Sequence, residues 1–139
     1  MITIDWCVVA SINTAIISWL VTSRVKSADE LKKCITTIKE DAEELAIHGS
    51  RYWTPAPTKE ERIETVVEIR IKYDSLSDKI DGLKKYTKKN IPEIRTAANV
   101  LYDAITGGSY QSATFKPNKA NIENIKICRK KLDHELNRI

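Results

Sequence analysis

Histidine and cysteine side chains are the groups in this sequence best suited to nucleophilic, acid–base or metal chemistry. The chain has 139 residues with 2 histidines and 3 cysteines. His48 and His134 stand far apart, and Cys7, Cys34 and Cys128 form no CxxC pair. Zinc sites and disulfide frameworks need such pairs at short spacing. We therefore predict no enzyme activity, no metal, no cofactor, and free thiols in a reducing compartment.

A first basic cluster offers contacts to an anionic surface. Lys84, Lys85, Lys88 and Lys89 surround Tyr86. Close to a membrane, each such lysine contributes about 1 kcal/mol of attraction to anionic lipid. The alternative is a solubilising helix end whose cations complement the helix dipole. We predict contact with lipid headgroups.

A second basic cluster lies near the C-terminus and contains Lys126, Arg129 and Lys130. Arg129 falls between Ile125 and Leu132, where the apolar spacing predicts a buried position. A buried guanidinium is costly unless an anion faces it. Either a carboxylate from another helix or a phosphate ligand would satisfy it, so the three residues are ligand-binding candidates.

Arg51, Tyr52 and Trp53 form an aromatic and basic cluster in the loop "GSRYWTPAP", residues 49–57. Such residues dominate the hot spots of protein interfaces, and they also stack on nucleobases. Arg51 and Trp53 are therefore further ligand-binding candidates. In the alternative interpretation, Trp53 closes the open end of a helical bundle.

The element that decides the location of the protein is the stretch "DWCVVASINTAIISWLVTSR", residues 5–24. Between Asp5 and Arg24 lie 18 residues without charge. As a helix they span about 27 Å, slightly less than the roughly 30 Å of a bilayer's hydrocarbon core. No basic segment precedes them, which disfavours a signal peptide. We predict that residues 6–22 cross a membrane; the alternative is a buried helix of a soluble bundle.

Charges beside this segment predict its orientation. Arg24 and Lys26 follow it, and only Asp5 precedes it. Because positive flanks stay in the cytoplasm, we expect the bacterial inner membrane, with the N-terminus outside and residues 27–139 in the cytoplasm.

Polar residues inside the apolar segment predict a homo-oligomer. On a helix, Ser11, Thr14, Ser18 and Thr22 fall on one stripe, and Asn13 lies away from it. Small hydroxyl residues at this spacing let helices pack closely in lipid, or line a narrow pore. An amide in lipid is satisfied by another subunit or by local backbone bonding.

The fold class that follows is all-α: an N-terminal single transmembrane helix (1–26) and a cytosolic helical domain (27–139) of about four helices. Apolar residues recur three and four positions apart, which is typical of amphipathic helices. Few glycines and prolines interrupt them. The apolar stripes run over residues 31–45, 66–83, 91–105 and 122–139.

Two signals conflict at the junction below the membrane. The sequence from Ser27 to Glu30 resembles a capping box, which favours a new helix start. No glycine or proline interrupts residues 4–48, which favours one unbroken helix. We predict near-continuity with a bend near Ser27.

Other helix ends have clearer signals. Thr58 and Glu61 form a second capping box, and Gly49 and Gly107 fit helix C-termini. If the helices alternate in direction, the loops 49–57 and 107–117 lie far from the membrane and the loop 84–90 lies near it. Helix starts are predicted at Asn90 and Asn118.

The phrases "RYWTP" (51–55) and "LYDAITGGSYQSA" (101–113) resemble elements of small bacterial single-pass membrane proteins. The plan of the chain is also similar to that of the membrane effectors of nucleotide-signalled antiphage defence. That resemblance implies a homo-oligomer whose cytosolic domains bind a cyclic oligonucleotide and whose spans then breach the inner membrane.

Three functions are consistent with the sequence. The first is an oligomeric membrane effector or channel gated through its cytosolic helices. The second is a membrane-tethered adaptor that docks a protein partner through the loop 49–57. The third is a soluble helical interaction protein with a buried first helix. None of the three needs a DNA or RNA duplex.

Overall fold

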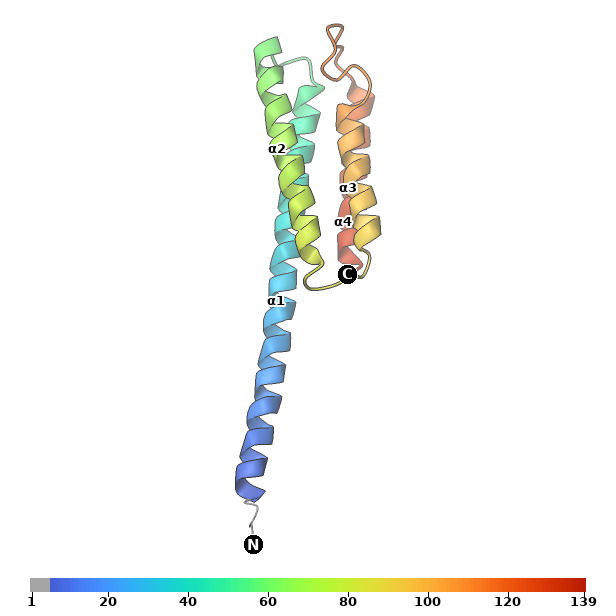
Figure 1. Cartoon of the computed structure of the whole chain (residues 1–139). Coiled ribbons are helices and arrows are strands. Elements are labelled where there is room, and N and C mark those ends of the chain that lie inside the picture. Colours follow the sequence, from blue (N-terminus) through green and yellow to red (C-terminus); the bar gives the residue numbers. More distant parts are fainter. Residues whose placement is uncertain (1–5) are drawn as a thin grey trace.

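The computed structural model describes residues 6–139, with side chains from residue 12 onward, and this part of the chain forms four α-helices (Figure 1). Predictions about Cys7 and Ser11 therefore lie outside the described side chains. The described residues contain no strand, which confirms the all-α class. The helices are α1 (Trp6–Tyr52), α2 (Lys59–Leu83), α3 (Ile91–Thr106) and α4 (Lys119–Asn137).

Helix α1 is one continuous helix of 47 residues. It runs through Ser27, so near-continuity is confirmed and the capping box there does not start a helix. Residues 6–30 project from the bundle and are called the stalk, and residues 31–52 form a helix of the bundle (Figure 1). Helix propagation adds one hydrogen bond per residue, and nothing between Trp6 and His48 interrupts it.

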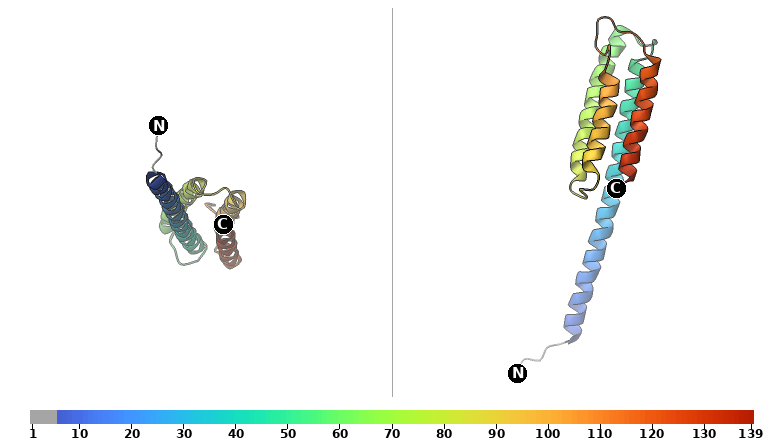
Figure 2. Two further views of the ribbon diagram at one scale, coloured as in Figure 1. Left: turned by 90° about the horizontal axis from the view of Figure 1, so that it is seen from below. Right: turned by 90° about the vertical axis from the view of Figure 1, so that its right-hand side faces the viewer.

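The bundle consists of residues 31–52 of α1 together with α2, α3 and α4, which alternate in direction. Around the bundle axis, α1 lies beside α2 and α4, and α3 lies beside α2 and α4 (Figure 2). The loops 53–58 and 107–118 are at the end far from the N-terminus, and the loop 84–90 is at the other end (Figure 1). The helices thus alternate in direction, which is the condition that the expected positions of the loops depended on.

The core is built from one apolar stripe per helix. On α3 every predicted position is buried: Ile91, Ile94, Ala98, Leu101 and Ile105. On the other helices, several predicted positions are only partly buried; they lie at or next to an end of a stripe, except Tyr73, which lies in the middle of α2 and stacks on Tyr102. These partly buried residues are Leu31, Ile35, Val66, Tyr73, Ile122 and Ile139.

The predicted helix ends are confirmed at four positions. The Thr58 hydroxyl accepts a hydrogen bond from the Glu61 amide at 3.2 Å, and the Asn118 side chain accepts one from the Asn121 amide at 3.1 Å. Helix α3 starts after Asn90 and stops before Gly107.

Gly49 was predicted as a helix end, and that prediction is wrong. It lies inside α1, which continues to Tyr52. A Cβ at Gly49 would lie 2.6 Å from Cγ1 of Ile105 on α3. The residue is therefore small because two helices approach each other closely there, not because the chain turns.

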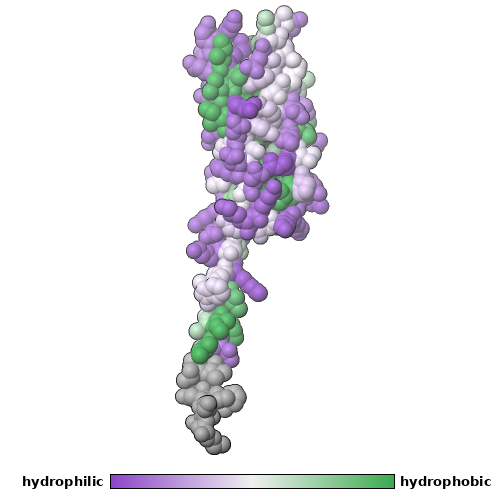
Figure 3. Space-filling model, in the orientation of Figure 1, coloured by the Kyte–Doolittle hydropathy of each residue, from purple (hydrophilic) through white to green (hydrophobic). Residues whose placement is uncertain are grey.

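Within the described residues, no helix combines the length and the apolar character that crossing a membrane requires. The structure thus confirms the four-helix bundle and leaves the transmembrane part of the predicted fold without support. The stalk nevertheless carries a band of apolar surface next to the atoms that are drawn in grey (Figure 3).

Replacing Gly49 with alanine is expected to lower the free energy of unfolding by about 1–3 kcal/mol, because the added methyl group overpacks the buried Ile105. The matched control is Gly82→Ala. Nothing lies within 4 Å of a Cβ at Gly82, so the better helix propensity of alanine should stabilise the protein by up to about 1 kcal/mol. Denaturant unfolding of both variants measures the difference. Equal stabilisation by the two substitutions would contradict the close-contact explanation.

Candidate binding surfaces

The distal end of the bundle is closed by Trp53, which is only 2% exposed. Its indole Nε1 donates a hydrogen bond to the Ile105 carbonyl oxygen at 2.9 Å. The Asn118 amide donates to the Trp53 carbonyl oxygen at 3.1 Å. Trp53 as a ligand-binding residue was therefore the wrong interpretation, and its alternative role of closing the bundle is confirmed.

An aromatic cap surrounds this tryptophan: Tyr52, Trp53, Tyr110 and Phe115. The Tyr52 ring lies 4.7 Å from that of Tyr110 and 5.1 Å from that of Phe115, between centroids. The Tyr52 hydroxyl accepts a hydrogen bond from the Gln111 amide at 2.8 Å. Burial raises the pKa of Tyr110 far above its usual range. The cap thus folds the loop 107–118 onto the end of α1.

Arg62 holds this loop from the side of α2. Its guanidinium carbon lies 4.1 Å from the centroid of the Phe115 ring, which is a cation–π contact. Its Nη2 also donates to the Thr54 carbonyl oxygen at 3.1 Å. The sequence analysis missed this residue, because a cation that meets an aromatic ring 53 positions away (115 − 62) leaves no local pattern.

The loop 49–57 does not present the aromatic anchors that the adaptor interpretation requires. Residues up to 52 belong to α1, and both Tyr52 and Trp53 are buried. Arg51 is exposed and lies 4.0 Å from a carboxylate oxygen of Glu61. Because buried aromatic residues cannot act as interface anchors, docking through this loop loses its main argument.

Arg129 does not occupy the apolar seam of α4, so that part of the prediction is wrong. The buried position between Ile125 and Leu132 belongs to Cys128, which is 4% exposed. Arg129 lies one residue further, about 100° around the helix. Its Nη1 is 3.2 Å from Oδ2 of Asp133, one turn along the same helix. The guanidinium thus has a carboxylate partner, and the structure gives no reason for a phosphate there.

The other basic candidates are spread over the surface. Lys126 pairs with Glu123 at 3.3 Å, and Lys130 is exposed. In the loop 84–90, Lys84 lies 3.8 Å from Asp81, and Lys85, Lys88 and Lys89 are also exposed. Ion pairs this exposed contribute little to stability, so these lysines stay available to an anionic partner.

A groove of about 700 Å³ runs between α3 and α4 on the outside of the bundle. Ala97 and Val100 line it from α3, and Ile127 and Cys128 line it from α4. Burial raises the pKa of the Cys128 thiol, which keeps it protonated and apolar. The groove therefore has an apolar floor.

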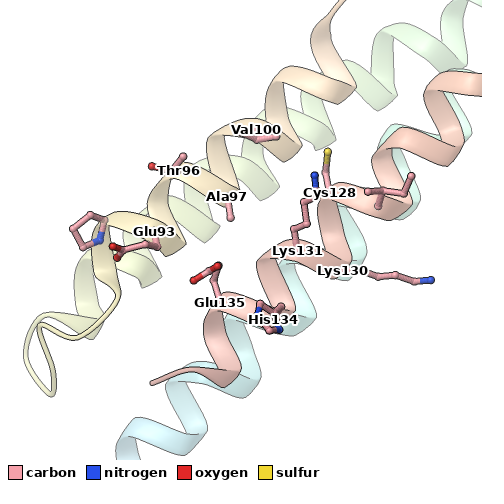
Figure 4. A pocket seen from close by; sticks show the side chains of 11 residues that line it. Glu93, Thr96, Ala97, Val100, Cys128, Lys130, Lys131, His134 and Glu135 are labelled. Carbon is pink, nitrogen blue, oxygen red and sulfur yellow. The ribbon is translucent and has the colours of Figure 1, made fainter.

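Charged residues form the rim of the groove. Figure 4 shows Glu93 on α3, and Lys131, His134 and Glu135 on α4. The sequence analysis missed this surface. The available signal was that Val100 and Ile127 are apolar residues outside the stripes that form the core.

The described residues contain no group of three or more histidine, cysteine or acidic side chains that could hold a metal ion. No protein-family model, curated protein or solved structure matches the chain. The function must therefore be argued from the surfaces themselves.

The revised position of Arg129 predicts a small effect on stability. Arg129→Ala removes an ion pair on a helix surface and should lower the free energy of unfolding by less than about 1 kcal/mol. Leu132→Ala truncates a fully buried side chain and should cost about 2–5 kcal/mol. Chemical denaturation of both variants tests this. A loss of unfolding free energy in Arg129→Ala as large as that in Leu132→Ala would contradict the surface position of Arg129.

Proposed function

We propose that the protein is a non-catalytic scaffold, which the apolar stalk of α1 tethers to a bilayer and whose helical bundle stands beside that bilayer. The observation behind this proposal is the exposure of the stalk. Every residue from 12 to 22 is exposed, and Ile17 and Trp19 are 61% and 67% exposed. The bundle covers none of these side chains, so the alternative of a buried first helix lacks the packing it needs.

Moving the apolar residues of the stalk from water into an apolar environment is favourable by a large free energy. Fully burying one aliphatic side chain is worth about 1.5–3 kcal/mol. Five aliphatic side chains of the stalk, taken together, therefore offer roughly 8–15 kcal/mol to an apolar environment. A bilayer supplies that environment on all sides of the helix. These five residues are Ile12, Ile16, Ile17, Leu20 and Val21.

The charges at the stalk support an orientation for the tether. Arg24 and Lys26 are the first cations after the apolar segment, and both are exposed. Under the positive-inside rule the bundle is then cytoplasmic, at the inner membrane, and the N-terminus is outside.

The loop 84–90 would stand above the headgroups rather than among them. Its Tyr86 lies beside Glu30 of α1, and α1 rises about 1.5 Å per residue from Thr22, the expected end of the span. The loop is therefore about 12 Å above that end, which is about one and a half Debye lengths at physiological salt. Lysine side chains there can orient the bundle but add little to membrane affinity.

One observation favours a channel-forming oligomer as a second candidate. Ser18 and Thr22 continue the hydroxyl stripe of the stalk, and Thr22 Oγ1 donates to the Ser18 carbonyl oxygen at 2.8 Å. In an oligomer, such a stripe can line a narrow pore, and the bundles would then gate it. Ion leakage from vesicles that contain the protein, compared with a Thr22→Leu/Ser18→Leu variant, tests this candidate.

Charged residues in the stalk should release the protein from membranes. Ile16→Lys/Leu20→Lys places two cations in the apolar segment, where each costs about 2.5–3.5 kcal/mol at the centre of a membrane helix. We expect the wild-type chain to remain with the membrane after alkaline washing and the variant to become soluble. The matched control, Val67→Lys/Ile71→Lys on the exposed face of α2, should remain membrane-bound.

The same fractionation decides against the tether if the wild-type chain is fully soluble without detergent. A reporter fused to Ile139 that is active only outside the cytoplasm tests the orientation separately. Strong activity of that reporter would show that the bundle lies on the other side of the membrane.

A further inference from the structure

The face formed by α3 and α4 carries apolar side chains that the chain itself leaves uncovered. Val100 on α3 is 44% exposed and Ile127 on α4 is 51% exposed. Both line the groove between the two helices, with Ala97 and Cys128 beneath them. Unlike single apolar residues on a surface, these line one groove, and charged residues of both helices lie beside them (Figure 4).

The unpaired charges at the edge of this face have opposite signs on the two helices, whereas the Glu135 carboxylate of α4 is already engaged by Arg138 and by the Asn90 side chain. Glu93 lies on α3, and Lys130 and Lys131 lie on α4. Within the described chain, none of the three takes part in an ion pair. The face therefore combines an acidic edge and a basic edge on either side of an apolar strip.

The heights of these residues along the bundle also match. The Asn90 side-chain amide donates to the Glu135 carbonyl oxygen at 2.7 Å, which fixes α3 against the antiparallel α4. Because the two helices are antiparallel and rise equally per residue, each step forward along α3 from Asn90 matches one step back along α4 from Glu135. Glu93 therefore lies level with Leu132, and Ala97 lies level with Cys128. Glu93 is thus at the height of the lysines, and Val100 is near the height of Ile127.

We propose that two copies of this chain pair through their α3–α4 faces, around a two-fold axis parallel to the helices. Such an axis places α3 of each copy against α4 of its partner at equal height. Glu93 of one copy then meets Lys130 and Lys131 of the other, and Val100 meets Ile127, and both contacts occur twice. A two-fold interface requires a self-complementary surface of this kind.

The other exposed apolar surface of the bundle does not have this property. Ile63, Val67 and Ile71 form a row on the outer face of α2. Glu60 and Glu64 flank this row near the start of α2, and Arg70, which pairs with Asp74, flanks it further along. In the same parallel arrangement, two such faces would set the glutamates of one copy against those of the other. Like charges at an interface oppose association, and the α3–α4 face is therefore the better surface for a second copy.

The size of the face predicts a weak dimer. Helix α3 has 16 residues, so it is about 24 Å long, and two adjacent helices are about 20 Å wide. The pair therefore buries about 1,000 Å² in total, at the lower limit for a specific interface. Association should depend on concentration, and attachment of both stalks to one surface would strengthen it. The pairing leaves both stalks on the same side but does not depend on the tether.

Sedimentation of the full chain in non-ionic detergent, over the widest accessible concentration range, tests the proposal. We expect a monomer–dimer equilibrium in the wild-type chain. Val100→Asp should raise its dissociation constant about tenfold or more, because two carboxylates would be buried per dimer. The matched control Val67→Asp on α2 should leave the equilibrium unchanged. Thermal unfolding shows whether each variant is folded.

Charge reversal then tests the pairing of the two edges. Glu93→Lys alone and Lys130→Glu/Lys131→Glu alone should each be monomeric, whereas an equimolar mixture of the two variants should form heterodimers. A mixture can recover association only through contacts between chains, so packing within one chain cannot explain that result.

Three results would overturn the proposal. The first is a wild-type chain that is monomeric at every concentration. The second is association that Val100→Asp leaves unchanged, which would place the contact on the stalk or on α2. The third is a mixture that stays monomeric. If the proposed membrane tether is wrong, the wild-type chain is soluble without detergent. The dimer can then be tested by the same sedimentation experiment in plain buffer.

Discussion

The contact between Ile105 and the end of α1 is the constraint on which the bundle depends. The side chain of Ile105 occupies the space that a Cβ at Gly49 would need, and its carbonyl oxygen accepts the hydrogen bond from Trp53. One residue of α3 thus fixes α1 by shape and by a polar contact at the same place. Because a buried indole N–H without an acceptor is costly, the two requirements hold α1 and α3 in one position.

This contact closes a bundle that is otherwise two helical hairpins. Helices α1 and α2 are held in register by polar contacts such as that of His48 Nδ1 with Glu68 at 3.0 Å and by the ion pair of Lys79 with Asp41 at 2.8 Å. Helices α3 and α4 form the second hairpin. The loop 84–90 links the two hairpins in sequence, and contacts such as the stacked rings of Tyr73 and Tyr102 join them along their length. The aromatic cap joins the hairpins at the opposite end, so both ends of the bundle are fixed and the α3–α4 groove lies between rigid walls.

The helices and most of the core could be predicted from the sequence, because apolar spacing and capping residues are local signals. All five core residues of α3 follow from spacing alone, and so does the start of α2 at Thr58. Three features depend on contacts between distant segments: the place of Gly49 inside a helix, the burial of Trp53, and the choice of Cys128 over Arg129. A glycine that ends a helix and one that admits a neighbouring helix look the same in sequence. On α4, Cys128 fits the three-and-four spacing, but the expectation of a regular seam placed Arg129 at the buried position instead.

The binding surfaces were harder to predict than the fold. The sequence analysis singled out basic residues because of their charge, yet Lys126 and Arg129 pair with a carboxylate on their own helix, and the other basic candidates are spread over the surface. The α3–α4 groove arises from residues such as Val100 and Ile127 that lie outside the core stripes, and only the packing of the two helices brings them together.

The continuity of α1 makes the protein a mechanical lever. Because one rigid rod serves both as stalk and as bundle helix, no joint separates the bundle from whatever holds the stalk. A change of about 10° in the tilt of the stalk would swing the aromatic cap by about 8 Å, given about 1.5 Å per residue between Arg24 and Trp53. A small reorientation at one end of the molecule is thereby converted into a displacement larger than a side chain at the other.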